Sequence, residues 1–97
     1  MKTERLSLGL IRLDGGTQSR LTINHDTVEE YAEILSALPP EEWPFPPLDV
    51  FFDGTEHFMS DGFHRYLGAE DAKRASAPCV IHQGTAKDAL IFGMTAN

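Results

Sequence analysis

Apolar residues recur at helical spacing between residues 26 and 38, in the clearest pattern of the chain. Thr27 followed by Glu30 forms a capping-box pattern, so a helix is expected to begin at a cap on Asp26 or Thr27. Pro39-Pro40 ends this helix, because proline lacks an amide donor and clashes with a continuing helix. The apolar positions on its inner face are Val28, Tyr31, Ala32, Leu35 and Leu38.

Three runs have the alternation or composition of strands. Leu6–Leu13 alternates loosely between apolar and polar residues and ends at Asp14-Gly15-Gly16, which predicts a strand followed by a loop. Leu48–Phe52 is expected to be a buried strand, Asp53-Gly54 a tight turn and His57–Ser60 the returning strand. These residues therefore predict a hairpin in the middle of the chain.

The segment between the first helix and this hairpin is rich in proline and aromatic residues. Residues 41–47 include Trp43-Pro44-Phe45-Pro46-Pro47, which cannot form a helix or a central strand. We expect Trp43 and Phe45 to pack over an edge of the core. The alternative is that this loop is a binding site for a partner protein.

Two more helices and a strand follow. Gly62 to about Ala75 is predicted to be a helix with Lys73 and Arg74 facing outward, and its inward residues are Phe63, Tyr66, Leu67 and Ala69. Pro78–His82 predicts another strand, and Thr85 with Asp88 caps a last helix with Ala86, Ala89, Leu90, Gly93 and Met94 on one face. The element order predicts an α+β domain with a small mixed sheet covered by helices.

Composition narrows the class of protein. The 97 residues suffice for one domain, and 41% hydrophobic and 24% charged residues are ordinary values for a globular protein. Eight basic and fifteen acidic side chains give a net charge of −7, and the longest basic cluster is Lys73-Arg74. A domain that gripped duplex DNA by itself would need a basic face, so another segment would have to supply that contact.

The chain's single cysteine rules out an internal disulfide. Cys79 lies in an apolar run, where a buried structural thiol is favoured over a nucleophile. No run is long enough to span a membrane and no signal-peptide pattern begins the chain, so a cytoplasmic location is expected. His25, His57 and His82 lack a common ligand spacing, so no metal site is predicted.

The most informative motif is Ser60-Asp61-Gly62-Phe63-His64-Arg65-Tyr66. The Asp61-Gly62 turn leads from a predicted strand directly into a predicted helix, whose first turn holds His64 and Arg65. The amides at a helix start lack internal partners and favour anions, and an arginine fork can clamp an oxyanion. The alternative is that His64 and Arg65 are solvated or pair with nearby acids.

Asp61–Leu67, preceded by the hairpin Val50–Gly54, resembles the signature of the ParB/sulfiredoxin-like superfamily. Thr17-Gln18-Ser19-Arg20 resembles the glutamine-arginine box of ParB N-terminal domains. Gly84-Thr85 with Asp88-Ala89, leading to Ala96-Asn97, resembles the helix that ends in their asparagine-containing box. The resemblance spans Leu8 to Asn97 and implies that residues 1–97 are a ParB-like N-terminal domain with a sulfiredoxin-like fold.

The resemblance implies a nucleoside triphosphate, CTP or ATP, bound with magnesium. It implies phosphate contacts from Gly62, His64 and Arg65, and further pocket contacts from Gln18, Arg20 and Asn97. The ParB box usually has a second arginine or a glutamate where Phe63 and His64 stand. The resemblance therefore identifies no catalytic residue and leaves nucleoside triphosphatase activity open.

ParB proteins place a helix-turn-helix domain downstream of this domain and act in DNA partition. Asn97 falls within a helix-like run that has no closing signal, so we expect the chain to be a piece of a longer protein. The resemblance implies chromosome or plasmid partition, or transcription regulation. It also implies DNA contact through a segment outside this chain, and it allows a homodimer.

Two enzyme classes are alternatives on the same motif. A small phosphotransferase resembling free-serine kinases would need a base such as Asp61, Asp53 or Glu30 beside the phosphates. A ParB-like nuclease would need converging carboxylates, and the sequence has no such cluster. Sulfiredoxins have their reactive cysteine where this chain has Phe63, so sulfiredoxin activity is not expected.

Overall fold

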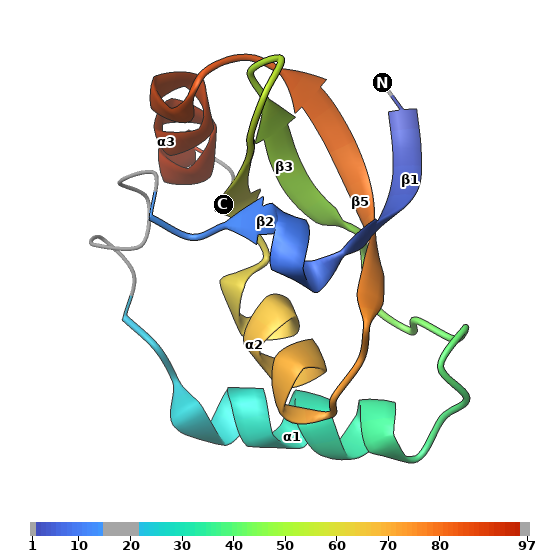
Figure 1. The fold of residues 1–97 in the computed structure, drawn as a ribbon. Coiled ribbons are helices and arrows are strands. Elements are labelled where there is room, and N and C mark those ends of the chain that lie inside the picture. Colours follow the sequence, from blue (N-terminus) through green and yellow to red (C-terminus); the bar gives the residue numbers. More distant parts are fainter. Residues whose placement is uncertain (1, 15–21, 96–97) are drawn as a thin grey trace.

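Five strands form one mixed sheet in the computed structural model, which describes residues 2–14 and 22–95 (Figure 1). The order is β1 (Lys2–Ser7), a 3₁₀ turn (Leu8–Leu10), β2 (Ile11–Arg12), α1 (His25–Ser36), β3 (Leu48–Phe52), β4 (His57–Asp61), α2 (Phe63–Asp71), β5 (Ser76–Gln83) and α3 (Ala86–Thr95). Helices α2 and α3 pack against the sheet, and α1 packs against α2. The predicted α+β class and mixed sheet are confirmed.

The sheet is curled, because its two edge strands are neighbours in the sequence. The strand order is β1-β5-β3-β4-β2, yet only the three residues Leu8–Leu10 separate β1 from β2. β1 pairs antiparallel with β5, whereas β2 pairs parallel with β4 at the other edge. The chain can reach both edges over so short a distance only if the edges approach each other.

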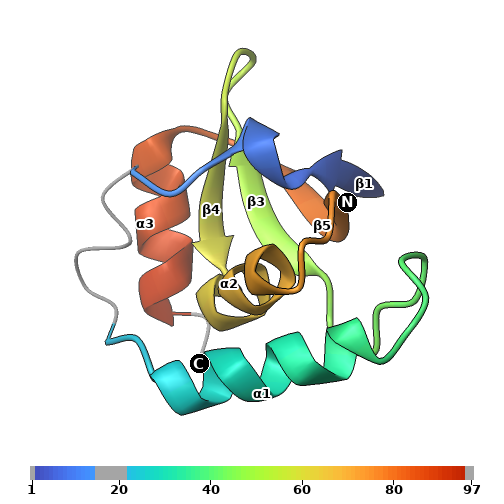
Figure 2. The ribbon, with the colours of Figure 1, turned by 60° about the horizontal axis from the view of Figure 1, so that its bottom comes forward.

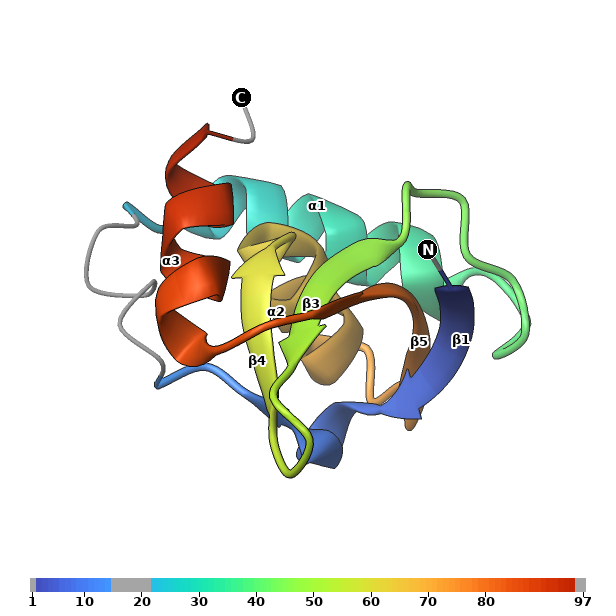
Figure 3. The same cartoon turned by 90° about the horizontal axis from the view of Figure 1, so that it is seen from above.

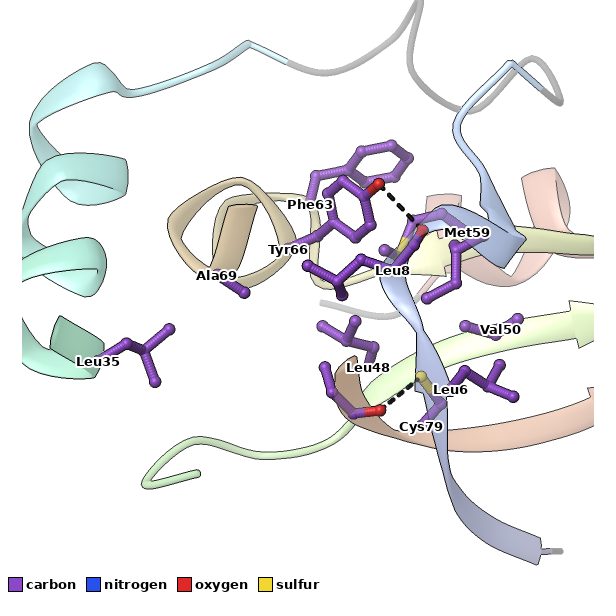
Figure 4. Close-up of a cluster of buried hydrophobic side chains, with 12 residues drawn as sticks. Leu6, Leu8, Leu35, Leu48, Val50, Met59, Phe63, Tyr66, Ala69 and Cys79 are labelled. Atoms are coloured by element: carbon purple, nitrogen blue, oxygen red, sulfur yellow. Dashed lines mark hydrogen bonds between the residues drawn. The ribbon is translucent and has the colours of Figure 1, made fainter. Parts of the chain in front are cut away.

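The prediction of one strand over Leu6–Leu13 was therefore wrong. The 3₁₀ turn interrupts that segment, and its ends join different edges of the sheet. Two contacts hold the turn: the Leu8 N–H donates to the Ala75 carbonyl at 3.0 Å, and the Tyr66 hydroxyl donates to the Leu8 carbonyl at 3.2 Å (Figure 4). Both partners lie more than fifty residues away, so local alternation could not reveal the break.

The hairpin agrees with the sequence prediction. β3 and β4 pair antiparallel with Val50 opposite Met59, and β4 extends one residue further than predicted, to Asp61. At the turn, the Asp53 carboxylate accepts hydrogen bonds from the amides of Glu56 and Thr55 at 2.7 and 2.8 Å. These bonds stabilise the charged carboxylate and lower the pKa of Asp53, and the bond from Glu56 has the larger effect.

Apolar residues are buried on both faces of the sheet. Successive side chains of a strand point to opposite faces, so neighbouring apolar residues pack on different sides. Val50 and Met59 point to the face covered by α2 and α1, whereas Phe51 and Phe58 point to the face covered by α3 (Figures 3 and 4). The larger cluster contains Leu6, Leu8, Ile11, Leu35, Leu48, Val50, Met59, Phe63, Tyr66, Ala69, Ala77 and Cys79. Burying one such Val, Leu, Met or Phe stabilises the fold by about 1.5–3 kcal/mol.

The start of α1 differs from the prediction. Its cap is Asn24, whose side-chain oxygen accepts the Thr27 amide at 3.1 Å, and the helix begins at His25. Asparagine is as good a cap as aspartate and better than threonine, so Asn24 takes the place of Asp26 and Thr27. The predicted inner face is correct at Val28 and Leu35, which are buried.

The end of α2 also differs from the prediction. α2 stops at Asp71, and Arg74, which was expected to face outward, is only 9% exposed. Its guanidinium donates at 2.8–3.1 Å to four carbonyls, those of Leu35, Pro39, Pro40 and Glu42. Arg74 therefore joins the end of α1 to the connector before β3.

Two predictions about individual side chains are confirmed. Trp43 and Phe45 pack against the larger cluster, and the Trp43 indole N–H donates to the Pro46 carbonyl at 3.0 Å. Cys79 is fully buried in β5, and burial raises the pKa of its thiol to about 11. The thiol therefore stays protonated at neutral pH and is a poor nucleophile.

Candidate functional site

The predicted anion motif lies in a cleft of about 740 Å³ where three helices meet. Residues at the starts of α1 and α2 line it on one side, and residues from the second half of α3 line it on the other. Figure 2 shows the lower end of α3 approaching the first turns of α1. The positive ends of two helix dipoles at one cleft make it a suitable place for an anion, although the Asn24 and Thr27 amides at the start of α1 already donate to His64 and to the Asn24 side chain.

Gly62 makes the turn from β4 into α2 possible. Its φ is 109°, in the left-handed region that favours glycine. A Cβ there would lie 2.8 Å from Leu48 Cδ2 and 2.9 Å from Arg65 Nη2. The missing side chain therefore lets the Arg65 guanidinium lie against the backbone and leaves the first amides of α2 beside the cleft.

His64 connects the starts of the two helices. Its Nε2 accepts the backbone N–H of Asn24, the cap of α1, at 3.0 Å. Only a neutral imidazole can accept at Nε2, so the ring proton is on Nδ1. The ring thus has one nitrogen in a structural bond and one N–H that can donate to a ligand.

Arg65 has unused hydrogen-bonding capacity. Its Nη2 donates to the Pro47 carbonyl at 3.2 Å, while its Nε is buried and has no hydrogen-bond partner within the described ranges. A buried donor without a partner costs about 1–3 kcal/mol, so the Arg65 Nε does not stabilise the fold. Gly62, His64 and Arg65 all line the cleft, and their role as phosphate contacts stays a prediction.

Among the three predicted candidate bases, only Asp61 lines the cleft. Asp61 ends β4 and lies next to Gly62. Asp53 lies at the hairpin turn and Glu30 is exposed on α1, and neither lines the cleft. The described cleft thus contains one carboxylate beside the proposed phosphate contacts.

The other predicted contacts lie outside the described residues. Gln18 and Arg20 belong to residues 15–21, and Asn97 belongs to residues 96–97. Thr22, the first described residue after the glutamine-arginine box, lines the cleft. The assignments of Gln18, Arg20 and Asn97 remain predictions.

His82 and Asp49 form a polar pair away from the cleft. His82 Nε2 pairs with Asp49 Oδ1 at 2.9 Å, and its ring stacks on Phe51 at 4.7 Å.

In residues 2–14 and 22–95, no group of three or more His, Cys, Asp or Glu residues is arranged to hold a metal ion. No helix in these ranges is long and apolar enough to cross a membrane.

The sequence analysis expected the last helix to reach the pocket only through Asn97, and it did not indicate that α1 contributes to the cleft. Asn24, Thr27 and Tyr31 line it from α1, and Leu90, Gly93 and Met94 line it from α3. Leu90, Gly93 and Met94 were expected to share one helix face, and Met94 on that face is 57% exposed. Helical spacing shows which residues share a face, and it does not show whether that face meets the core or a cleft.

No protein-family model matches the chain, and no curated protein matches its sequence. Among solved structures, sulfiredoxin from Arabidopsis thaliana is 20% identical with a TM-score of 0.73, over 97% of this chain and 98% of that one. The C-terminally truncated partition protein ParB from Caulobacter crescentus, complexed with CTP-γ-S, is 16% identical with a TM-score of 0.76. That match covers all of this chain and 53% of ParB.

The same ParB complexed to the centromeric parS site is 14% identical with a TM-score of 0.69, over 94% of this chain and 44% of that one. This chain thus spans about half the length of the ParB structures and nearly the whole sulfiredoxin. The predicted sulfiredoxin and ParB N-terminal fold is confirmed.

Proposed function

We propose that this chain is the nucleotide-binding N-terminal domain of a ParB-like protein that acts in DNA partition or transcription regulation. The observation that carries the proposal is the meeting of two helix starts with Gly62, His64 and Arg65 at one cleft. This cleft lies on a fold shared with a ParB that was crystallised with CTP-γ-S. The proposed ligand is a nucleoside triphosphate, CTP or ATP, with magnesium.

The described residues suit phosphate groups. The free amides of the first turn of α2, the Nδ1–H of His64 and the guanidinium of Arg65, a residue that lines the cleft, are all donors. Gln18, Arg20 and Asn97 would add contacts from the first loop and the end of the chain. A magnesium ion would reduce repulsion between the triphosphate and Asp61, and carboxylate and phosphate oxygens are its usual ligands.

DNA contact would come from a segment outside this chain. The net charge of −7 disfavours binding of these residues to duplex DNA. We expect the isolated domain to bind duplex DNA poorly at physiological salt, as measured by fluorescence anisotropy. In the full protein, a downstream helix-turn-helix would read the DNA in the cytoplasm, and two copies could form a homodimer.

The test is a thermal-shift panel with CTP, ATP, GTP and UTP, each with magnesium, on the wild type and Arg65→Ala. A ligand at about 100 times its Kd stabilises the folded state by roughly 2.7 kcal/mol, which raises the Tm of a small domain by several degrees. Arg12→Ala is the matched control. Arg12 lies on β2, its Nη2 is 2.7 Å from Asp14 Oδ2, and it does not line the cleft. The proposal fails if no nucleotide raises the wild-type Tm.

A small phosphotransferase is the second candidate, and the position of Asp61 favours it. This carboxylate lies in the cleft next to the proposed phosphate contacts, where a general base would be needed. This candidate would be supported if the protein consumed ATP and phosphorylated a small alcohol such as free serine. Asp61→Asn should abolish that reaction. A nuclease ranks last, since a second converging carboxylate is absent from the described cleft lining.

Sulfiredoxin chemistry is not proposed despite the fold. It needs a cysteine at the start of α2, where this chain has Phe63. The chain's one cysteine, Cys79, is fully buried in β5 and does not line the cleft.

A further inference from the structure

The cleft has an apolar wall that phosphate groups would not use. Leu90 and Met94 lie one turn apart on α3 and line the cleft. Met94 is 57% exposed, although it is one of the larger apolar side chains of the chain. The amides and cationic side chains that suit an anion lie instead at the start of α2.

Close contacts with β4 fix the position of this wall. A Cβ on Gly93 would lie 2.6 Å from the Ser60 carbonyl oxygen, so α3 lies directly on the strand at this point. The buried Ser60 hydroxyl donates to the Ala89 carbonyl one turn earlier. On the other side of α3, the Phe92 ring packs against Phe51 at 5.6 Å. Leu90 and Met94 are therefore held at the edge of the cleft.

The size of the cleft also exceeds what a phosphate site needs. Its volume of about 740 Å³ falls in the range of sites for whole small molecules, which combine apolar walls with a few placed polar groups. The polar groups lie at the starts of α2 and α1, and Leu90 and Met94 form an aliphatic patch on α3. The aromatic rings of Tyr31 on α1 and Phe63 on α2 also line the cleft. A ligand that matches both sides has a charged end and a flat apolar end.

We propose that Leu90 and Met94 form the subsite for the base of the nucleotide, a role that rests on the proposed function. With the phosphates at Gly62, His64 and Arg65, the base packs against the Leu90 side chain and the Met94 thioether. Sulfur–aromatic contacts are favourable and tolerate different ring systems. These two side chains have no hydrogen-bond donor and only a weak thioether acceptor. They should therefore increase the affinity for nucleotides over inorganic polyphosphate, without selecting one base over another.

The experiment compares CTP, ATP and inorganic tripolyphosphate, each with magnesium, by isothermal titration calorimetry. Met94→Ala should weaken binding of both nucleotides by about three- to tenfold and leave the Kd for tripolyphosphate unchanged. Leu90→Ala should show the same selectivity. Ile91→Ala is the matched control, because Ile91 is 51% exposed on the same helix and does not line the cleft.

The outcomes separate the subsite from the proposed function. The subsite is overturned, while nucleotide binding stands, if Met94→Ala has the wild-type affinity for nucleotides. It is also overturned if the variant loses as much affinity for tripolyphosphate as for nucleotides. If the wild type binds tripolyphosphate as tightly as nucleotides, the subsite is also overturned. If the wild type binds none of the three ligands, the proposed function fails, and the subsite fails with it. An unchanged Tm of the unliganded variant confirms that the fold is intact.

Discussion

The two ends of α2 each have an arginine, and the two arginines differ in how fully they are hydrogen-bonded. Arg74, just beyond the end of the helix, donates to four carbonyls and is nearly buried. Arg65, in the first turn, donates to one carbonyl and has a buried Nε without a partner in the described ranges. A fully hydrogen-bonded cation stabilises the fold, whereas one with unused donors is available to a ligand.

Removal of Arg74 should have the largest effect on stability. Arg74→Ala leaves four carbonyls without their donor, and we expect the free energy of unfolding to fall by about 3–5 kcal/mol. Arg74→Lys should recover only part of this loss, because a single ammonium cannot reproduce the planar fork. Urea unfolding monitored by circular dichroism measures both. A loss below about 1 kcal/mol would mean that Arg74 resembles a surface cation.

Gly62→Ala should have the next largest effect and should act on both stability and binding. The left-handed backbone and the 2.8 Å approach to Leu48 Cδ2 cost about 1–3 kcal/mol. The new methyl group would also displace the Arg65 guanidinium. Gly54→Ala is a control for backbone strain alone. Gly54 also has a positive φ, but a Cβ added there would have no atom within 4 Å. Equal nucleotide binding by the two variants would contradict the role given to Gly62.

His64→Ala should cost about 1 kcal/mol, because it removes one hydrogen bond between the helix starts. The Asn24 amide would lose its acceptor, so its hydrogen exchange should become faster than in the wild type. Exchange measured by NMR at single-residue resolution tests this directly. The Thr27 amide, bonded to the Asn24 side chain, is the internal control and should change less. Unchanged exchange at Asn24 would show that the His64 bond does not hold the start of α1.

Arg65→Ala should change the stability of the unliganded protein least, by about 0.5 kcal/mol or less, since the lost Pro47 bond is offset by removal of an unpaired buried donor. The same variant should lose most of the nucleotide-dependent rise in Tm. Comparison of Arg65→Ala with Arg74→Ala, each with and without CTP or ATP, is the sharpest test of the difference between the two arginines. A strong destabilisation by Arg65→Ala without nucleotide would remove that difference.

The residues of the motif around Gly62 could be read from the sequence, but their surroundings could not. The Asp-Gly turn and the helix after it follow from local backbone preferences, so the positions of His64 and Arg65 in the first turn were predictable. Their partners, the Asn24 amide and the Pro47 carbonyl, lie 40 and 18 residues away. Hydrogen bonds over such separations depend on how α1 and β3 are placed, and no local pattern encodes that placement.

The reciprocal cap of α3 is an example of a feature that the sequence determined by itself. The Thr85 amide donates to the Asp88 carboxylate at 2.8 Å, and the Asp88 amide donates to the Thr85 hydroxyl at 3.2 Å, as the spacing predicted. The hairpin, the prolines that end α1 and the glycine turn before α2 are local in the same way. Each depends on side chains and backbone preferences within a few residues.

The tertiary structure decided which helix faces meet the core and which meet the cleft, and it decided the role of each arginine. Arg74 looked like a surface residue in a charged run, yet the end of α1 and the connector after it place four carbonyls around it. Met94 was expected only to share an apolar helix face, and the contact of Gly93 with Ser60 places it at the cleft. A periodic pattern records only the chemistry of a face, and burial and hydrogen bonding depend on what distant segments bring against it.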